Sequence, residues 1–197
     1  TGASTLGLNI AAAVTAGDTA TIDTGTGTSD SLAIVNMLTT GDTGSTTSNY
    51  TITDFEDVSF DTGSYDTPAT QNVQAFNIGA NTLTLTGSNG LTTAGAITAT
   101  TIDGSALTGA LVMNSSASVT TITGGSAADT LVGDAASTID GGAGADIITG
   151  GTGNDTLTGG TGADVITTNT GNDTVTAGAG NDTVNVDSGL SALDVIT

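Results

Sequence analysis

The sequence contains no lysine, arginine or histidine, whereas 20 of its 197 residues are Asp or Glu, so the formal net charge is −20 at pH 7. Salt bridges between side chains therefore cannot form within the chain. Self-repulsion of this size disfavours a compact state unless bound cations neutralise it, and it disfavours polyanions as direct partners. We expect cations to be part of the folded state, and we expect neither nucleic acid nor an anionic membrane surface as a partner.

The missing residue types also limit the chemistry of the chain. Without His there is no histidine zinc site and no Ser-His-Asp triad, without Cys there is no thiolate, and without Lys or Arg no cationic side chain can stabilise an oxyanion. The acidic stretch 54–66 could suggest paired carboxylates for glycoside hydrolysis. Alternation places Asp54 and Glu56 on one outward strand edge, which favours a solvated face or a further cation site. We therefore expect no enzymatic activity.

Aromatic residues are also scarce, with two Tyr, three Phe and no Trp, and there is a single Pro. This limits the apolar surface that a globular core could bury. Abundant Thr, Gly, Ser, Asn and Asp without helical periodicity is typical of many short strands and turns. No Cys is present for a disulfide framework, and no apolar run approaches the length of a membrane span. We expect an all-β chain without membrane insertion, and disorder is the alternative for the first hundred residues.

Residues 124–185 repeat one unit of nine residues. The units are GGSAADTLV, GDAASTID, GGAGADIIT, GGTGNDTLT, GGTGADVIT, TNTGNDTVT and AGAGNDTVN. Glycine at the first, second and fourth places is expected to supply positive φ, so the first six residues form a turn and the last three a minimal strand. Such a strand cannot bury a core alone, so we expect stacked coils of two units each. The predicted inward residues are Leu131, Ile139, Ile148, Leu157, Ile166, Val175 and Val184.

The pattern G-G-x-G-x-D-x-U-x, where U is a large apolar residue, resembles the RTX family of hemolysin-type calcium-binding repeats. The resemblance implies a right-handed parallel β-solenoid that ends in a calcium-binding RTX β-roll. It also implies that each Ca²⁺ is held between successive turns on one edge by their carbonyls and Asp side chains. The matching positions are Asp129, Asp146, Asp155, Asp164, Asp173, Asp182, Gly124, Gly141, Gly142, Gly144, Gly150, Gly151, Gly153, Gly159, Gly160, Gly162, Gly171, Gly178 and Gly180.

The sixth-place Asp residues explain why a cation is needed. Turns two units apart lie on one edge of the solenoid, about 4.8 Å apart, so their carboxylates repel each other. Ca²⁺ suits this place because it accepts six to eight oxygens in flexible geometry. The same-edge pairs are Asp129 with Asp146, Asp146 with Asp164, Asp164 with Asp182, and Asp155 with Asp173.

Two departures from the pattern put further sites in question. The second unit is one residue short and has Ser137 in the Asp place, and the continuation VDSGLSALD has Ser191 there. The pairing of Ser137 with Asp155 and the site beyond Asp173 therefore lack a carboxylate. The turn TNTGND lacks two glycines, but Asn169 tolerates a left-handed backbone, so we expect it to bind.

Upstream, we expect residues 1–120 to form a Thr/Gly/Ala-rich β-solenoid segment and residues 121–197 to form the RTX β-roll. Nine residues before Leu131 stands Ile122, and nine before that stands Met113, so the coil should continue upstream without its Asp residues. We expect Ile52, Phe55, Val58 and Phe60 to face inward as well. Gly25, Gly27 and Asp30 keep a loosened Gly-x-Gly-x-x-Asp skeleton of the repeat. This skeleton is a candidate calcium site, and an ordinary Gly/Asp turn is the alternative.

The composition together with the repeat resembles calcium-dependent surface-layer proteins exported by type I secretion. This implies a structural segment at the extracellular bacterial cell surface, which folds on meeting calcium and self-associates into a lattice. Cell-surface polysaccharide would be a partner through another part of the parent. The alternatives are the calcium-binding C-terminal folding and secretion domain of a type I secreted protease or lipase, and an RTX adhesin module. The limits at Thr1 and Thr197 lead us to expect a segment of a longer protein.

Overall fold

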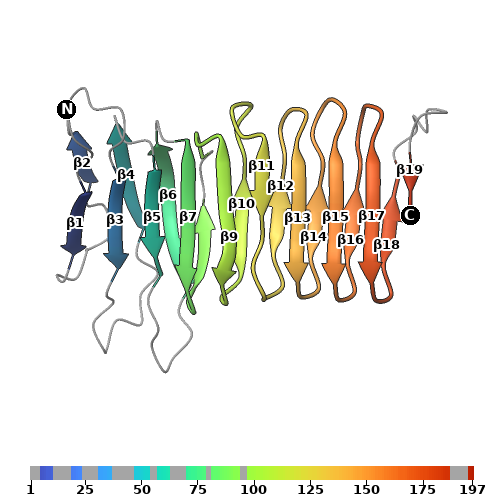
Figure 1. Cartoon of the computed structure of the whole chain (residues 1–197), viewed down its shortest axis with the longest axis horizontal. Coiled ribbons are helices and arrows are strands. Elements are labelled where there is room, and N and C mark those ends of the chain that lie inside the picture. Colours follow the sequence, from blue (N-terminus) through green and yellow to red (C-terminus); the bar gives the residue numbers. More distant parts are fainter. Residues whose placement is uncertain are drawn as a thin grey trace.

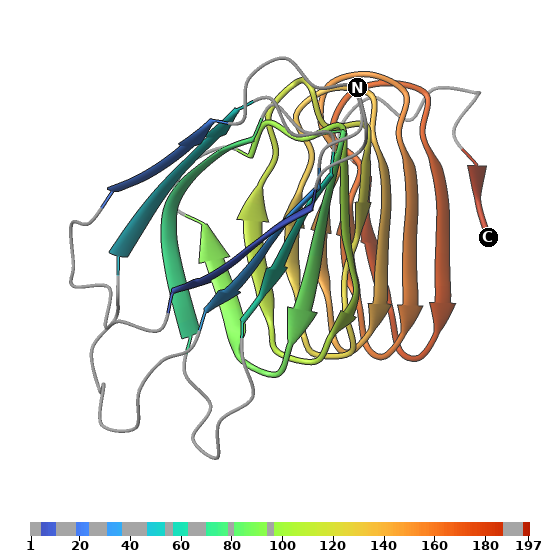
Figure 2. The same cartoon turned by 60° about the vertical axis from the view of Figure 1, so that its left-hand side comes forward.

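The computed structural model is a parallel β-solenoid in which a ten-stranded and a nine-stranded sheet face each other (Figures 1 and 2). The structure describes residues 57–62, 81–93, 97–186 and 195–197 in full, and the backbone of the strands at 5–10, 19–23, 31–36, 47–53 and 70–78. Odd-numbered strands form one sheet and even-numbered strands the other. None of these residues belongs to a helix that could cross a membrane.

The strands of the nine-stranded sheet shorten to three residues in the repeat, as predicted. The ten-stranded sheet keeps six-residue strands within residues 138–179, so the prediction of three-residue strands was wrong there, because these strands run on into the first half of the next turn. The ten-stranded sheet contains β1 (Thr5–Ile10), β3 (Ser31–Asn36), β5 (Asp57–Asp61), β7 (Thr82–Gly87), β9 (Thr101–Leu107), β11 (Thr121–Thr123), β13 (Thr138–Ala143), β15 (Thr156–Thr161), β17 (Thr174–Ala179) and β19 (Val195–Ile196). The nine-stranded sheet contains β2 (Thr19–Asp23), β4 (Thr47–Thr53), β6 (Thr70–Ile78), β8 (Gly90–Thr93), β10 (Leu111–Asn114), β12 (Thr130–Val132), β14 (Ile147–Thr149), β16 (Val165–Thr167) and β18 (Thr183–Asn185).

The strand register follows the repeat. Leu157 of β15 pairs with Val175 of β17, 18 residues later, which confirms two nine-residue units per coil. Ile122 of β11 pairs with Ile139 of β13 after only 17 residues, because the second unit lacks one residue. The short unit is therefore absorbed within its turn and leaves the strand register intact.

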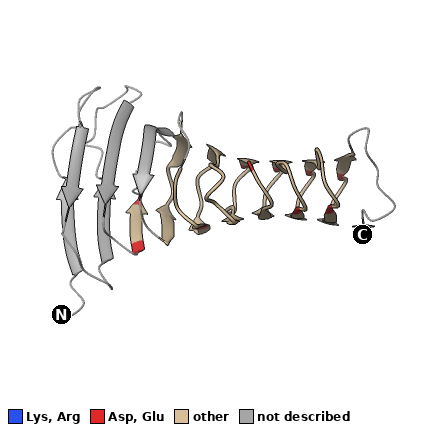
Figure 3. Cartoon of the chain, turned by 90° about the horizontal axis from the view of Figure 1, so that it is seen from above, with Lys and Arg blue, Asp and Glu red and all other residues tan. Residues whose placement is uncertain are grey.

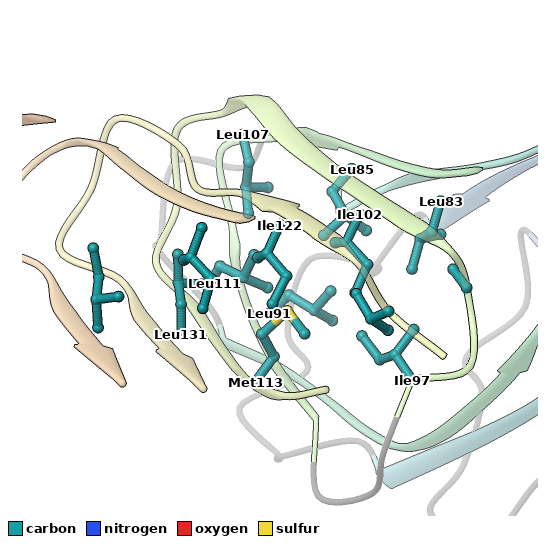
Figure 4. Close-up of a cluster of buried hydrophobic side chains, with 14 of the residues drawn as sticks. Leu83, Leu85, Leu91, Ile97, Ile102, Leu107, Leu111, Met113, Ile122 and Leu131 are labelled. Atoms are coloured by element: carbon teal, nitrogen blue, oxygen red, sulfur yellow. The ribbon is translucent and has the colours of Figure 1, made fainter. Parts of the chain in front are cut away.

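The core lies between the two sheets. All the predicted inward residues of the repeat are buried except Val184, which is partly buried against the same core. Ile122, Met113, Val58 and Phe60 are buried as predicted, whereas the side chains of Ile52 and Phe55 lie outside the described residues. Each strand of the repeat buries at most one large aliphatic side chain. By contrast, β7 buries both Leu83 and Leu85, so the core is thicker upstream (Figure 4).

The two sheets continue across the predicted boundary at residue 120. Ile102 of β9 pairs with Ile122 of β11, which pairs in turn with Ile139 of β13. The division into segments 1–120 and 121–197 stays a prediction. The loosened turn Gly25–Asp30, the acidic residues Asp54 and Glu56, and residues 187–194 lie outside the described residues.

Two hydrogen bonds between the uncharged residues Thr62 and Asn89 connect neighbouring coils at one upstream edge, and we call this pair the Thr62–Asn89 clasp. Asn89 lies at the bend between β7 and β8, and its Nδ2 donates to the Thr62 carbonyl at 2.8 Å. Thr62 Oγ1 donates back to the Asn89 carbonyl at 2.8 Å. Both side chains are buried. These amide and hydroxyl groups satisfy the turn backbone without a carboxylate, which fits the prediction that the coil continues upstream without the Asp residues of the repeat.

Candidate metal centre

The turns of the repeat line the two edges of the solenoid. The first edge consists of turns 124–129, 141–146, 159–164 and 177–182, which lead from the ten-stranded to the nine-stranded sheet. The second edge consists of turns 133–137, 150–155 and 168–173, which lead back. Figure 3 shows acidic residues recurring along the stacked coils.

Each sixth-place residue is tied to the same place in the next coil. On the first edge, the backbone N–H of Asp129 donates to Asp146 Oδ1 at 2.8 Å, and that of Asp146 donates to Asp164 Oδ1 at 2.8 Å. The N–H of Asp164 donates to Asp182 Oδ1 at 3.0 Å. The structure therefore brings the predicted first-edge partners together in one ladder, which we call the first Asp ladder.

The second edge has a shorter ladder of the same kind. The N–H of Asp155 donates to Asp173 Oδ1 at 2.9 Å, and the N–H of Ser137 donates to Asp155 Oδ1 at 2.7 Å. Ser137 thus occupies the Asp place, as the register predicts. Its own Oγ donates to the Ala135 carbonyl at 2.8 Å, so it bonds within its turn and adds no negative charge to the ladder.

Two carboxylate oxygens of the first Asp ladder lack a partner. Asp146 and Asp164 are buried, and the Oδ2 atom of each has no hydrogen-bond donor. A buried anionic oxygen without a donor is costly, because it has lost water and gained nothing in return. Neither a Lys nor an Arg exists in the chain to pair with them. With the carboxylates ionised at neutral pH, a bound cation is the way that remains to compensate this charge.

Backbone oxygens converge on the same two atoms. A Cβ built at Gly141 would lie 2.6 Å from Asp146 Oδ2 and 2.6 Å from the carbonyl oxygen of Gly159 in the next coil. A Cβ at Gly159 would lie 2.6 Å from Asp164 Oδ2 and would also collide with the Ala177 carbonyl oxygen. Carboxylate and carbonyl oxygens from successive turns therefore surround a space that only glycine leaves open. This all-oxygen donor set is what Ca²⁺ prefers.

Side chains alone do not make the site. Within the described residues, no three acidic side chains gather as a metal-binding cluster. Turn carbonyls must therefore supply much of the coordination, with Asp146 and Asp164 supplying the charge. A bound Ca²⁺ would supply the positive charge that the ladder lacks.

The glycine places have two different roles, which corrects one prediction. Positive φ occurs at second-place Gly142, Gly160 and Gly178 and at fourth-place glycines such as Gly162, as expected. Asn169 also has φ 63°, in agreement with its predicted left-handed backbone. The prediction was wrong for second-place Gly125 and Gly151 and for the whole first place, because none of these glycines has positive φ. There, glycine is required by the close approach of oxygens from two turns.

Fourth-place glycines offer a direct test of this backbone requirement. Gly162 has φ +144°, and an added Cβ would collide with the Gly144 carbonyl of the previous coil. We expect Gly162→Ala to lower the free energy of unfolding by about 1–3 kcal/mol or more. Urea unfolding at saturating calcium measures this, with Thr161→Ala at the exposed neighbour as the control. Equal unfolding midpoints for the two variants would contradict the expectation.

Burial raises the pKa of three carboxylates in the two Asp ladders. It raises the pKa of Asp146 to about 6, an effect that the N–H of Asp129 partly offsets and that the charges of Asp129, Asp164 and Asp140 reinforce. Burial also raises the pKa values of Asp129 and Asp155, with backbone N–H groups opposing the shift. Each of these groups is therefore easier to bury protonated than charged.

These pKa values predict how the calcium-free chain responds to pH. A group with a raised pKa in the folded state contributes stability that is present at low pH and is lost as pH rises through the folded value. We therefore expect the calcium-depleted chain to gain far-UV β signal when the pH falls from about 7.5 to about 5, with a midpoint near the Asp146 pKa of about 6. Asp146→Asn, which mimics the protonated group, should weaken this dependence. Superimposable spectra at the two pH values would contradict the prediction.

Sequence reasoning missed a second polar ladder beside the Asp ladder of the second edge. The N–H of Asn172 donates to Asn154 Oδ1 at 2.9 Å, and Thr152 pairs with Thr170 across the same coils. The sequence does contain a signal for this ladder, since both turns share the tetrapeptide TGND. The fifth-place Asn therefore supports the turn that positions Asp155 and Asp173.

Comparison with known families bears on the same residues. Residues 123–157, 133–166 and 158–189 match the family model of the RTX calcium-binding nonapeptide repeat (4 copies). The matched residues include both Asp ladders, so this block is a calcium-binding structural domain whose repeats bind calcium ions at several sites. No curated protein and no solved structure matches the chain.

Proposed function

We propose that this chain, which carries RTX repeats over residues 123–189, is a non-catalytic structural segment of a bacterial cell-surface protein. It folds on meeting calcium outside the cell and assembles into a surface layer. The observation that carries the calcium-dependent part is the first Asp ladder, in which buried Oδ2 atoms of Asp146 and Asp164 have no donor. Proteins with RTX repeats are typically secreted, which supports an extracellular site of folding.

Folding of the segment is coupled to calcium binding. The oxygens of the site come from turns in different coils, so the site does not exist in the unfolded chain. Calcium-binding free energy is therefore folding free energy. A chain with 20 uncompensated acidic residues would stay extended where calcium is scarce and would wind up where calcium is abundant.

An exposed apolar row supports the self-association part. On the outer face of the nine-stranded sheet, Val112, Ile147 and Val165 are 37%, 50% and 37% exposed. Strand pairing aligns them in one row, with Thr130 between Val112 and Ile147. Apolar side chains gathered on an exposed surface are typical of contact sites with other macromolecules. A second copy of the chain is the partner that a surface layer requires.

Two other functions use the same calcium-dependent fold. The block could serve as the C-terminal folding and secretion domain of a type I secreted protease or lipase, or as a module of an RTX adhesin. The apolar row favours the surface layer over the protease or lipase domain, because such a domain has no need of a repeating contact face. A surface-layer protein would also reach cell-surface polysaccharide through another part of its parent.

Electron microscopy of the purified chain, with and without millimolar calcium, tests the assembly. We expect ordered two-dimensional lattices on calcium addition. The double variant Ile147→Thr, Val165→Thr should lose them while keeping its β signal, because Thr already occupies the same row at Thr130. Thr156→Ser on the outer face of the other sheet is the control. A chain that stays monomeric in calcium would contradict the proposal. In a separate assay with whole cells, cell aggregation without lattices would favour the adhesin.

A further inference from the structure

Four of the six Asp-bearing turns fall into two kinds, which differ in the hydrogen bonding of the Asp side chain. In turn 124–129, the second-place Gly125 N–H donates to Asp129 Oδ2 at 2.7 Å. In turn 150–155, the second-place Gly151 N–H donates to Asp155 Oδ2 at 2.8 Å. We call these two turns closed, because each carboxylate is held by the backbone of its own turn.

Turns 141–146 and 159–164 lack this bond, and we call them open. Asp146 and Asp164 keep Oδ1 in the ladder, but their buried Oδ2 atoms have no donor. In turn 141–146 the second-place N–H, that of Gly142, donates instead to Asp140 Oδ1 at 3.1 Å. The amide that closes the other turns is therefore directed elsewhere.

The backbone explains the difference. Second-place Gly142 and Gly160 have φ +92° and +108°, whereas Gly125 and Gly151 are not in the left-handed region. A change in φ at this glycine turns its N–H toward or away from the sixth-place Asp, which lies four residues later. The two kinds of turn are thus distinct conformations of similar sequences, GGSAAD and GGTGND against GGAGAD and GGTGAD.

Each closed turn stands where an Asp ladder begins. Asp129 Oδ1 accepts the N–H of Leu111 at 2.7 Å, and the upstream coil offers no Asp at that place. Asp155 Oδ1 accepts the N–H of Ser137 at 2.7 Å. Both oxygens of each starting carboxylate therefore accept a backbone N–H. Charge-assisted bonds of this length are strong, so each starting carboxylate is already partly compensated and needs a cation less than Asp146 and Asp164 do.

We propose that calcium binds through the open turns of Asp146 and Asp164, and that Asp129 and Asp155 are positioning residues that start each ladder with backbone N–H groups in place of a metal. Oxygens also converge at Gly124 and Gly150, but there the second-place amide already supplies the positive partner. This inference rests on the proposed calcium-dependent folding. The turns of Asp129 and Asp155 then form a contact that needs no metal, and on it the first calcium-binding coil packs against the upstream solenoid.

Counting bound ions in four single variants of the full chain tests the assignment. Asp146→Asn and Asp164→Asn should each bind at least one Ca²⁺ fewer per chain by equilibrium dialysis. Their calcium midpoints of folding should rise by about tenfold or more. Asp129→Asn and Asp155→Asn should bind as many ions as the wild type while unfolding at lower urea, even in saturating calcium. Equal ion loss in Asp129→Asn and Asp146→Asn would overturn the proposal.

A measurement on the unmodified chain covers the case in which the Asp129 and Asp155 variants do not fold. In saturating calcium, the amide protons of Gly125 and Gly151 should be shifted downfield and should exchange slowly with solvent. Fast exchange at both amides would show that the carboxylates have turned to a metal, and would overturn the assignment. Failure of the proposed function looks different, because the wild type would then bind no calcium or would keep one fold with and without it.

Discussion

Removing calcium from the full chain is expected to unwind residues 124–186 while residues 97–120 keep their protection from hydrogen exchange. Each strand of the repeat block buries at most one large aliphatic side chain, and its edges carry buried carboxylates without basic partners. The upstream coils bury more apolar side chains and include the Thr62–Asn89 clasp. In a solenoid each coil depends mainly on its neighbours, so one part can open while another remains folded.

Hydrogen–deuterium exchange read out by mass spectrometry resolves the two parts in one sample. The upstream peptides serve as the internal control, and restoring calcium should restore protection in the block. Unchanged protection of residues 124–186 in excess chelator would contradict the prediction. Loss of protection along the whole chain would contradict the expected independence of the upstream coils.

Among single Asp replacements, Asp164→Ala is expected to impair calcium-dependent folding most. Its Oδ1 accepts the N–H of Asp146, its N–H donates to Asp182 Oδ1, and its buried Oδ2 has no donor. Asp164 therefore has a ladder partner on both sides and serves two sites. One neighbour of Asp146, by contrast, is Asp129, whose carboxylate the Gly125 N–H already holds, and Asp182 is only half buried in the last complete turn. We expect the calcium midpoint of folding to rise by more than about tenfold, the scale seen when groups around a metal are removed.

Calcium titration followed by far-UV circular dichroism measures this effect. Asp182→Ala is the matched control and should shift the midpoint less. Asp164→Asn separates the hydrogen bond from the charge, because its amide oxygen can still accept the Asp146 N–H. We expect Asn to be nearly as harmful as Ala. Equal midpoints for Asp164→Ala and Asp182→Ala would contradict a special place for Asp164.

The period of the repeat made much of the fold predictable. Nine-residue units with one large apolar residue at the eighth place can bury that residue only by stacking, and Leu157 and Val175 pair as this requires. The same arithmetic places Asp146 opposite Asp164, so the ladder partners followed from counting. Ser137 in the Asp place was predictable for the same reason.

The conformation of each turn and the role of first-place glycine could not be predicted, because the amino-acid sequence of a single unit does not specify them. GGTGND and GGTGAD differ at one residue, yet Gly151 turns its N–H to Asp155 whereas Gly160 adopts positive φ. Each turn packs against groups of the neighbouring coil, and a single unit of the repeat does not specify those contacts. The role of first-place glycine was also hidden, since close approach between coils is a tertiary contact.

The most direct test of the central claim is an anomalous-difference map from crystals of the full chain grown in calcium. The claim is that cations held between coils compensate the buried carboxylates and so allow the thin strands to stack. It predicts anomalous density beside Oδ2 of Asp146 and of Asp164, close to the carbonyls of Gly159 and Ala177. A well-ordered repeat block with no anomalous density along either Asp ladder would contradict it.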